Sequence, residues 1–367
     1  MAITSSTTRR LATGAAPVTT RCCAPSWCSR WRSRGEWNLT GKLCPVRLLA
    51  ALLAAAAGPA AASEPLYAKN LSPFAGLFGL PSQRSAMTTA AGSFAGALHS
   101  SVANHYVLDS KADELVNLDG ETLRLALDLR LGLAENWDVQ LEVPWLEHSG
   151  GELDEFIDDW HDFWGMSDGG RSKVPRDQLD YFYTTGDGQA RLVDDASGIG
   201  DVSLSLSHAF YNSGDAAASA VLGYKFGSGD ADDFTGSGAD DVFIALRMSG
   251  HHLSDLPLSW HGQVGYLHAG DGDLVEGFQE QDLWFAGISM DWRFAQNWSA
   301  IVQVDAHAGP LDSDLTATGD DAFLLTVGGR WRFARHWSVD VSVVEDIHVE
   351  SAPDVTFQAS LRFQPDA

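Results

Sequence analysis

Two histidine pairs, His148-Ser149 and His161-Asp162, are the residues of this sequence that could do hydrolytic chemistry. A serine nucleophile needs a base within hydrogen-bonding reach. Neighbouring residues of an extended chain point to opposite faces, so His148 is poorly placed to activate Ser149. No motif with the required spacing is present, and we therefore predict no catalytic residues, no metal ligands and no cofactor. A lipid-modifying hydrolase stays open as an alternative.

Charged residues also alternate with apolar ones along the stretch from Thr122 to Val143. Six leucines, at alternate positions from 123 to 133, share one face, and Arg124, Asp128 and Arg130 lie on the other. Alternation of this kind is the period of a β-strand, and the pattern resumes after a short turn, as in a hairpin. Strands of soluble proteins usually have about five or six residues, whereas strands that cross a membrane need roughly 9–11.

The same alternation recurs along the chain and predicts twelve strands. They are residues 93–107, 122–133, 137–143, 201–210, 216–227, 240–249, 258–267, 283–294, 298–307, 321–333, 337–344 and 355–363. The link after each even strand is short and the link after each odd strand is long. This asymmetry is typical of outer-membrane barrels, which have short periplasmic turns and long outer loops. We therefore predict an all-β fold, an antiparallel transmembrane up-and-down β-barrel of about twelve strands spanning residues 93–363.

Three short turns carry a near-repeat that ends in tryptophan, at residues 132–137, 293–298 and 332–337. An indole ring prefers the membrane interface, so these residues predict an aromatic girdle. A soluble hairpin with a packed tryptophan is the alternative. The last strand ends in an aromatic residue, Phe363. In this it is similar to the terminal strand by which outer-membrane barrels are recognised for assembly. The partners expected are that assembly machinery, outer-membrane lipid and lipopolysaccharide, and no nucleic acid.

The inward face of the predicted strands carries eight bases and eight acids, so it has no net charge. The lumen-lining residues expected are Arg124, Asp128, Arg130, Asp138, Glu142, Arg247, Asp291, Arg293, Asp305, Arg330, Arg332 and Arg362, together with Lys225, Asp201, Asp241 and Asp340. Buried charges persist when they are paired. The set predicts either a salt-bridge lattice that fills a small barrel or a narrow polar path, and twelve strands accommodate both.

The link from residue 144 to residue 200 is the longest and carries a helix-like pattern. Asp154 can cap a short amphipathic helix whose stripe includes Trp160, and this helix belongs to a long outer loop. It could plug the barrel mouth, lie in the membrane interface, or pack on the rim without a task. The gate residues expected are Gly150, Gly151, Asp154, Trp160, His161, Gly165 and Arg171.

The N-terminal part of the chain has three predicted regions. Residues 46–62 have the basic start, apolar run and small-residue end of a cleaved secretory signal peptide. Residues 1–45 have no periodicity and are interpreted as a mis-annotated upstream extension, with a genuine extension as the alternative. Residues 63–92 are expected to form a periplasmic segment before the barrel.

Removal of residues 1–62 changes the charge of the chain. The full chain has 24 basic and 49 acidic residues; eight bases and one acid lie in that segment, which leaves 16 and 48 and a net charge of −32. Such acidity excludes nucleic acid as a partner. All four cysteines are also lost, so a mature exported chain has no disulfides. Acidic clusters in the outer loops are interpreted as a solvated rim, with Ca²⁺ or Mg²⁺ binding as the alternative.

Several motifs resemble those of domain-of-unknown-function family 3187, a family of Gram-negative envelope proteins, over about residues 65–363. They are Asp119-Gly-Glu-Thr122, the leucine hairpin, the stretch 150–157, His161, Gly165, Gly169-Gly-Arg171 and Gly198-Ile-Gly-Asp201. The resemblance implies an outer-membrane barrel and brings no established activity. Gly198-Ile-Gly-Asp201 is also similar to the corresponding motif in outer-membrane channels of aromatic-degradation pathways.

These observations predict a porin-like outer-membrane channel or conduit for small polar or amphipathic molecules, gated by the 144–200 loop. A lipid-modifying hydrolase and a structural envelope protein are the alternatives.

Overall fold

The computed structural model describes residues 63–151, 153, 155, 175–186, 188–251, 256–275, 277–347 and 351–364. The predicted upstream extension and signal peptide lie outside the described residues, as does the predicted amphipathic helix except for residue 155. Among the described residues, no helix has the length and apolarity needed to cross a membrane.

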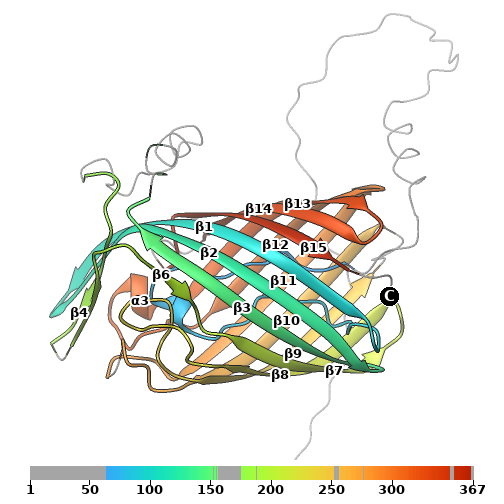
Figure 1. Cartoon of the computed structure of the whole chain (residues 1–367), viewed down its shortest axis with the longest axis horizontal. Coiled ribbons are helices and arrows are strands. Elements are labelled where there is room, and N and C mark those ends of the chain that lie inside the picture. The colour runs from blue at the N-terminus through green and yellow to red at the C-terminus, as the bar shows by residue number, and fades with distance from the viewer. Residues whose placement is uncertain are drawn as a thin grey trace, which may run out of the picture. The chain divides into compact units, whose positions relative to one another are not determined.

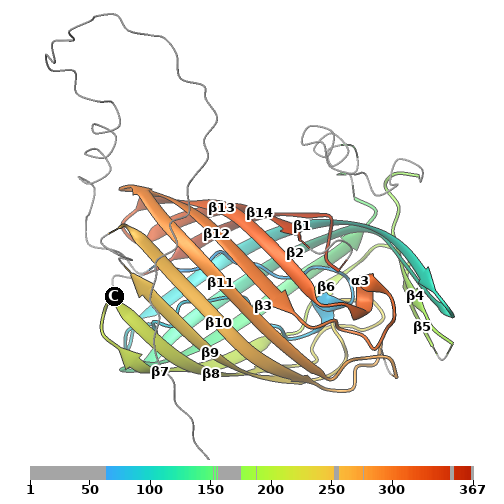
Figure 2. The same ribbon diagram turned by 180° about the vertical axis from the view of Figure 1, so that it is seen from behind.

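Twelve antiparallel strands close into a barrel (Figures 1 and 2). They are β1 (Phe94–Lys111), β2 (Glu114–Ala134), β3 (Trp137–Ser149), β7 (Ser203–Asn212), β8 (Ala216–Lys225), β9 (Asp241–His251), β10 (Leu258–Ala269), β11 (Asp282–Ala295), β12 (Trp298–His307), β13 (Ala322–Ala334), β14 (Trp337–Asp346) and β15 (Val355–Phe363). β1 pairs with β2 on one side and with β15 on the other, from Gly96 opposite Phe363 to Asn104 opposite Val355. This closure confirms the predicted fold class.

Shorter elements lie at the end of the barrel that carries the long links, which we call the long-loop end; the opposite end is the short-turn end. Within the 144–200 segment, β4 (Asp180–Thr184) pairs with β2 and β5 (Gln189–Leu192), and β6 (Ala196–Ile199) pairs with β3. A 3-10 turn, η1 (Ala75–Leu77), precedes the barrel, and α3 (Thr316–Gly319) lies between β12 and β13.

The predicted long link 108–121 is wrong, because β1 and β2 continue through it and turn at residues 112–113. β4 pairs with the first residues of β2, with Tyr183 opposite Val116 and Tyr181 opposite Leu118. Both valine and leucine are buried there. The pairing satisfies backbone groups that would otherwise form an open edge, so the chain stays extended beyond the barrel.

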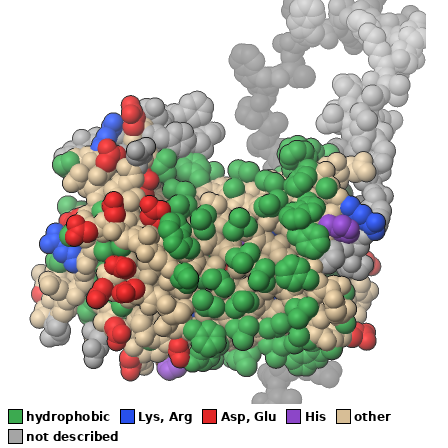
Figure 3. Space-filling model, in the orientation of Figure 1, with side chains coloured by type: hydrophobic (Ala, Val, Ile, Leu, Met, Phe, Trp, Pro, Cys, Tyr) green, Lys and Arg blue, Asp and Glu red, His purple; other side chains and the backbone are tan. Residues whose placement is uncertain are grey.

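The two faces of the barrel wall differ as the alternation predicts. Leucines of β2 such as Leu127 and Leu133 are exposed on the outside, and most of the charged residues between them are buried on the inside. Figure 3 shows a broad band of hydrophobic side chains over the strands and acidic side chains toward the long-loop end. The exposed band has the character of a surface that faces lipid.

The three tryptophan turns share one backbone feature. In each of them the ladder skips a register position just before the turn, and alanine then pairs with tryptophan: Ala134 with Trp137, Ala295 with Trp298 and Ala334 with Trp337. Such bulges increase the local twist of a strand. The three tryptophans are exposed on the outside at the short-turn end.

The outward face predicts a dependence of stability on depth. We expect Leu127→Lys, near the middle of the apolar band, to lower the free energy of unfolding by about 2–4 kcal/mol, because a lysine at the bilayer midplane loses its hydration. The matched change Leu133→Lys, beside the short turn, should cost only about 0–1 kcal/mol. Urea titration of both variants folded into liposomes measures the difference, and equal costs would contradict a lipid-facing band.

Candidate functional site in the barrel interior

The inward charges of the wall form ion pairs across neighbouring strands. Asp340 of β14 accepts hydrogen bonds from Nε of Arg330 and Nε of Arg362, both at 2.7 Å. Arg124 donates to Glu142 at 2.8 Å on β3. These residues are all at most 9% exposed. A buried charge is tolerated when its partners satisfy it, so these pairs hold the wall residues in fixed positions.

The most prominent feature of the interior is the chain that precedes β1. Residues 63–91, which we call the inner segment, lie among the inward side chains of the strands. The segment begins at the short-turn end, where the hydroxyl of Ser63 donates to Asp291 at 2.7 Å and Glu64 pairs with Arg130 at 2.7 Å. It reaches the long-loop end at Asn70, which contacts His307 of β12 at 3.1 Å.

The inner segment then turns at η1 and returns to the short-turn end. On the way back Arg84 pairs with Asp138, and the backbone N–H of Thr89 donates to the same carboxylate at 2.8 Å. The interior is thus traversed twice, and the blue ribbon of Figures 1 and 2 marks this part of the chain. The expectation that residues 63–92 form a periplasmic segment is therefore corrected, because their charges find partners on the inner wall.

Wall side chains also satisfy the irregular backbone of the inner segment. Arg362 donates to the carbonyl of Pro65 at 3.1 Å, and Lys225 donates to the carbonyl of Leu77 at 2.8 Å. Asp241 accepts from the backbone N–H of Gly79 at 2.8 Å. A backbone without regular secondary structure needs such partners wherever it is buried. The wall and the inner segment therefore form one polar network.

Burial and neighbouring charges perturb three groups of the inner segment. Burial alone would raise the pKa of Glu64, but the guanidinium groups of Arg130 and Arg84 outweigh it and the pKa is lowered. Burial raises the pKa of Tyr67, whose ring stacks on His99 with centroids 3.9 Å apart. Burial lowers the pKa of Lys69 despite the nearby carboxylate of Glu142. Glu64 is thus held ionised by its partners.

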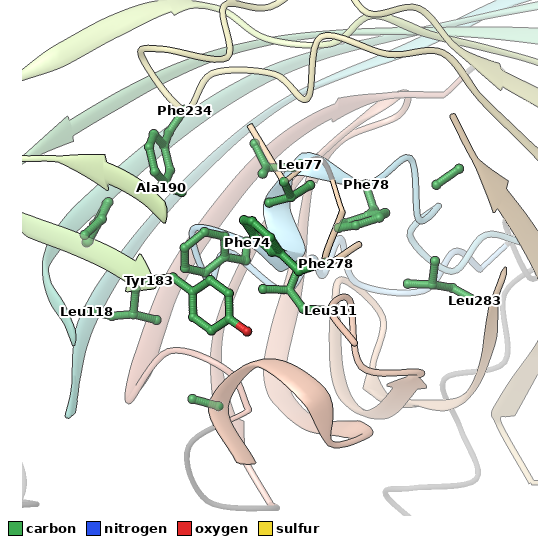
Figure 4. Packing of buried hydrophobic residues seen from close by; sticks show 14 of the residues in the cluster. Phe74, Leu77, Phe78, Leu118, Tyr183, Ala190, Phe234, Phe278, Leu283 and Leu311 are labelled. Carbon is green, nitrogen blue, oxygen red and sulfur yellow. The ribbon is translucent and has the colours of Figure 1, made fainter. Parts of the chain in front are cut away.

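The long-loop end is closed by a cluster of apolar side chains that we call the apolar cap. Phe74 of the inner segment packs against Tyr183 of β4 and Phe234, with ring centroids 5.6 and 5.9 Å apart. Tyr183 in turn lies 5.1 Å from Phe278, and Leu311 packs in the same cluster (Figure 4). Four long links and the turn of the inner segment therefore meet in one apolar core above the polar interior.

Two empty spaces remain beside the inner segment. The larger, of about 960 Å³, follows residues 68–81 toward the apolar cap. The smaller, of about 560 Å³, lies against residues 81–84. Lys69, Gly79, Pro81 and Ser203 line both. The two spaces therefore lie next to each other along the inner segment.

The predicted lumen residues differ in how deeply they are buried. Nine are buried: Arg124, Asp128, Arg130, Asp138, Glu142, Arg247, Asp291, Arg330 and Arg362. Arg293, Arg332 and Asp305 are partly exposed. Asp305 accepts hydrogen bonds from the amides of Gln83 and Gln303, at 2.7 and 2.8 Å. Lys225 bridges Asp201 and Asp241 at 2.9 and 3.0 Å. Ion pairs join many of these charges, whereas Arg247 and Asp305 have amide hydrogen-bond partners.

The predicted gate residues are only partly described. Asp154, Trp160, His161, Gly165 and Arg171 lie outside the described residues. Gly150 and Gly151 are packed closely, since a Cβ at position 150 would lie 2.4 Å from the carbonyl oxygen of Asp177 and one at position 151 would lie 1.9 Å from the carboxyl carbon of Glu121. Gly151 also has a φ of +69°. Both features require glycine at these positions, and a gating role for them stays a prediction.

His148 is buried at the edge of the apolar cap. Its Nδ1 lies 3.0 Å from the hydroxyl of Thr122, and its Nε2 donates to the carbonyl of Phe234 at 3.1 Å. Its ring also meets Tyr181 edge-on. Both ring nitrogens therefore have partners that join β3 to β2 and to an outer link.

Two acids at the long-loop end bind backbone groups of the link between β8 and β9. Asp201 accepts from the N–H groups of Gly229 and Ser237, and Asp240 accepts from Gly227. In the part of the chain that the structure describes, no group of three or more His, Cys, Asp or Glu side chains could hold a metal ion.

The sequence analysis missed the inner-segment residues that contribute to the interior, chiefly Glu64, Tyr67, Asn70 and Arg84. Prolines at 65, 73 and 81 and the absence of alternation do indicate a segment that is not a strand. No local pattern says where such a segment lies. One signal in the sequence could indicate its location. Glu64, Lys69 and Arg84 are charged residues in a segment that directly precedes a barrel whose lumen carries both acids and bases.

We expect the Glu64–Arg130 pair to hold the inner segment in place. In a mature chain without cysteine, Ala86→Cys places a buried thiol beside Ser249. Adding Glu64→Gln should raise its labelling rate with a charged maleimide by on the order of tenfold or more, because a charge-assisted hydrogen bond is lost. The exposed Glu135→Gln is the matched control, and equal labelling rates in all three backgrounds would contradict this role.

The lowered pKa of Glu64 also predicts a pH dependence of stability. An ionised carboxylate with a depressed pKa stabilises the folded chain fully above its unfolded pKa, about 4.3, and this contribution is lost as pH falls toward the folded value. The urea midpoint of Glu64→Gln should therefore lie below that of the wild type at pH 7, with a gap that shrinks below about pH 4. A gap independent of pH would show that Glu64 does not act through its charge.

Comparisons with known proteins give the chain a family. The sequence model of a family described as "Protein of unknown function (DUF3187)" matches residues 44–364, which confirms the resemblance seen in the motifs. No curated protein matches the chain.

Solved structures with similarity include the COG4313 outer membrane channel from Pseudomonas putida F1, at 13% identity, 75% coverage of this chain, 96% of that chain and a TM-score of 0.49. The toluene transporter TbuX of Ralstonia pickettii matches at 10% identity, covering 82% of this chain and 95% of that one with a TM-score of 0.36. The KdgM porin matches at 9% identity, covering 74% and 99% with a TM-score of 0.39. The match over residues 44–364 shows that the chain belongs to the DUF3187 family of proteins of unknown function.

Proposed function

We propose that this protein is an outer-membrane conduit for small polar or amphipathic molecules, and that the 144–200 segment controls its opening. The observation that carries the proposal is the pair of adjoining spaces along the inner segment, inside a closed barrel and beneath the apolar cap. A barrel that served only as a wall would not need space inside it.

The lining of these spaces favours small amphipathic solutes. Phe78 and Phe285 provide apolar surface in the larger space, and Lys69 and His307 provide polar contacts there. Ligand sites of proteins commonly combine an apolar lining with a few placed polar groups. The inner segment occupies part of the barrel's cross-section beside these spaces, which favours small molecules as solutes.

The 144–200 segment supplies part of the apolar cap. Tyr181 and Tyr183 of β4 are fully buried between the inner segment and the other long links. β4 is held mainly by its pairing with the part of β2 that extends beyond the barrel, so it can leave without opening the barrel wall. Its departure would remove two large rings from above the larger space, which supports a role in opening.

The outward surface of the barrel supports a location and partners for the protein. We propose that the exposed apolar band contacts outer-membrane lipid and lipopolysaccharide, and that the strand ending at Phe363 engages the outer-membrane assembly machinery after removal of a signal peptide. Phe363 lies against Trp337 at the short-turn end, with ring centroids 5.1 Å apart and the rings tilted by 56°.

A structural envelope protein is the second candidate, because the ion pairs and the inner segment fill most of the interior and give it rigidity. In that case no solute crosses the barrel in any variant. A lipid-modifying hydrolase would instead alter lipid composition without conductance.

We expect the double variant Tyr181→Ala/Tyr183→Ala to raise solute influx into proteoliposomes severalfold, because the apolar cap loses two buried rings. Deletion of residues 150–171, from the same 144–200 segment, should also raise the influx. Influx of a small sugar or amino acid is measured by liposome swelling, alongside planar-bilayer conductance. Tyr211→Ala is the matched control, since Tyr211 is exposed on the outside of β7. Influx that stays at the level of empty liposomes in every variant would favour the structural candidate.

A further inference from the structure

Arg247 of β9 differs from the other buried arginines of the interior. Its side chain is 2% exposed and its Nε donates to the amide oxygen of Gln263 at 2.8 Å, but its Nη1 has no hydrogen-bond partner. Within the described residues, no carboxylate lies in ion-pair range of Arg247, whereas Arg84, Arg130 and Arg330 each have one.

An unpaired buried guanidinium is costly, because it has lost water without gaining a counter-charge. The charged groups that interact with Arg247 are Arg84, Arg130, Asp138 and Glu64. Those two acids are already paired with Arg84 and Arg130. Arg247 is therefore left without an ion-pair partner of its own among the described residues.

Arg247 lines the smaller of the two interior spaces. Arg84 of the inner segment lines the same space, and its Nε is likewise without a hydrogen-bond partner. Two guanidinium groups, one on the wall and one on the inner segment, thus each keep an unused donor beside a common space. A negatively charged ligand there would satisfy donors from both parts of the chain.

We propose that this space binds the carboxylate of a small organic acid, with Arg247 as its principal ligand. The planar fork of a guanidinium matches the two oxygens of a carboxylate. Phe243 and Pro81 line the same space and can contact a short apolar body. The inference names a ligand class for the proposed conduit and in that sense rests on it, but binding can be measured without transport.

The test uses the mature full-length protein folded in detergent, at constant ionic strength. Calorimetric titration compares butyrate with butyramide, its neutral analogue of nearly equal shape, and with inorganic phosphate. We expect butyrate to bind and butyramide not to bind. Arg247→Gln, which removes the charge and keeps an amide donor, should weaken butyrate binding about tenfold or more. Arg191→Gln is the control, since Arg191 is exposed on β5.

A heat-modifiable gel shift establishes that each variant is folded. Arg247→Lys serves as a second variant, because it keeps the charge without the planar fork, and it should bind butyrate with intermediate affinity. The inference is overturned if the wild type does not bind butyrate, if butyramide binds equally well, or if Arg247→Gln binds as the wild type does. Phosphate binding tighter than butyrate binding would overturn the carboxylate assignment. Butyrate binding without solute influx would count against the conduit alone.

Discussion

The ladder between β1 and β15 is the interaction on which the rest of this structure depends. Once Gly96 pairs with Phe363 and Asn104 with Val355, no strand of the twelve leaves an unpaired edge along the wall. A closed wall has an inside and an outside, so the two faces of each strand meet different surroundings. The leucines of β2 then face outward, and Arg124, Asp128 and Arg130 become buried charges that need partners.

Those partners come from two sources, and the second joins the N-terminal chain to the barrel. Some charges pair within the wall, as Arg330 does with Asp340, whereas Arg130 and Asp138 pair with Glu64 and Arg84 of the inner segment. Removing the segment would leave wall charges without their partners. The inner segment is therefore a part of the barrel's interior rather than a linker before it, and Arg247 stands out because neither source satisfies it.

The interior changes character along its axis. Toward the short-turn end it is a network of ion pairs, and at the long-loop end Phe74 of the inner segment meets Tyr183, Phe234 and Phe278 in an apolar core. A polar network keeps one fixed arrangement because each donor needs its own acceptor, whereas an apolar contact can separate without leaving an unsatisfied charge. The proposed opening movement is therefore assigned to the apolar end, to which β4 of the 144–200 segment contributes.

The sequence by itself determined the twelve strands, their faces, the short turns and most of the charges that line the interior, because alternation is a local property that each strand carries in its own residues. It could not place residues 63–91, extend β1 and β2 through residues 108–121, or show that Arg247 lacks a counter-charge. Each of these depends on contacts between distant residues, such as Ser63 with Asp291, 228 positions apart. Only the tertiary structure brings such residues together, so only it decides which charges are paired and which space is left.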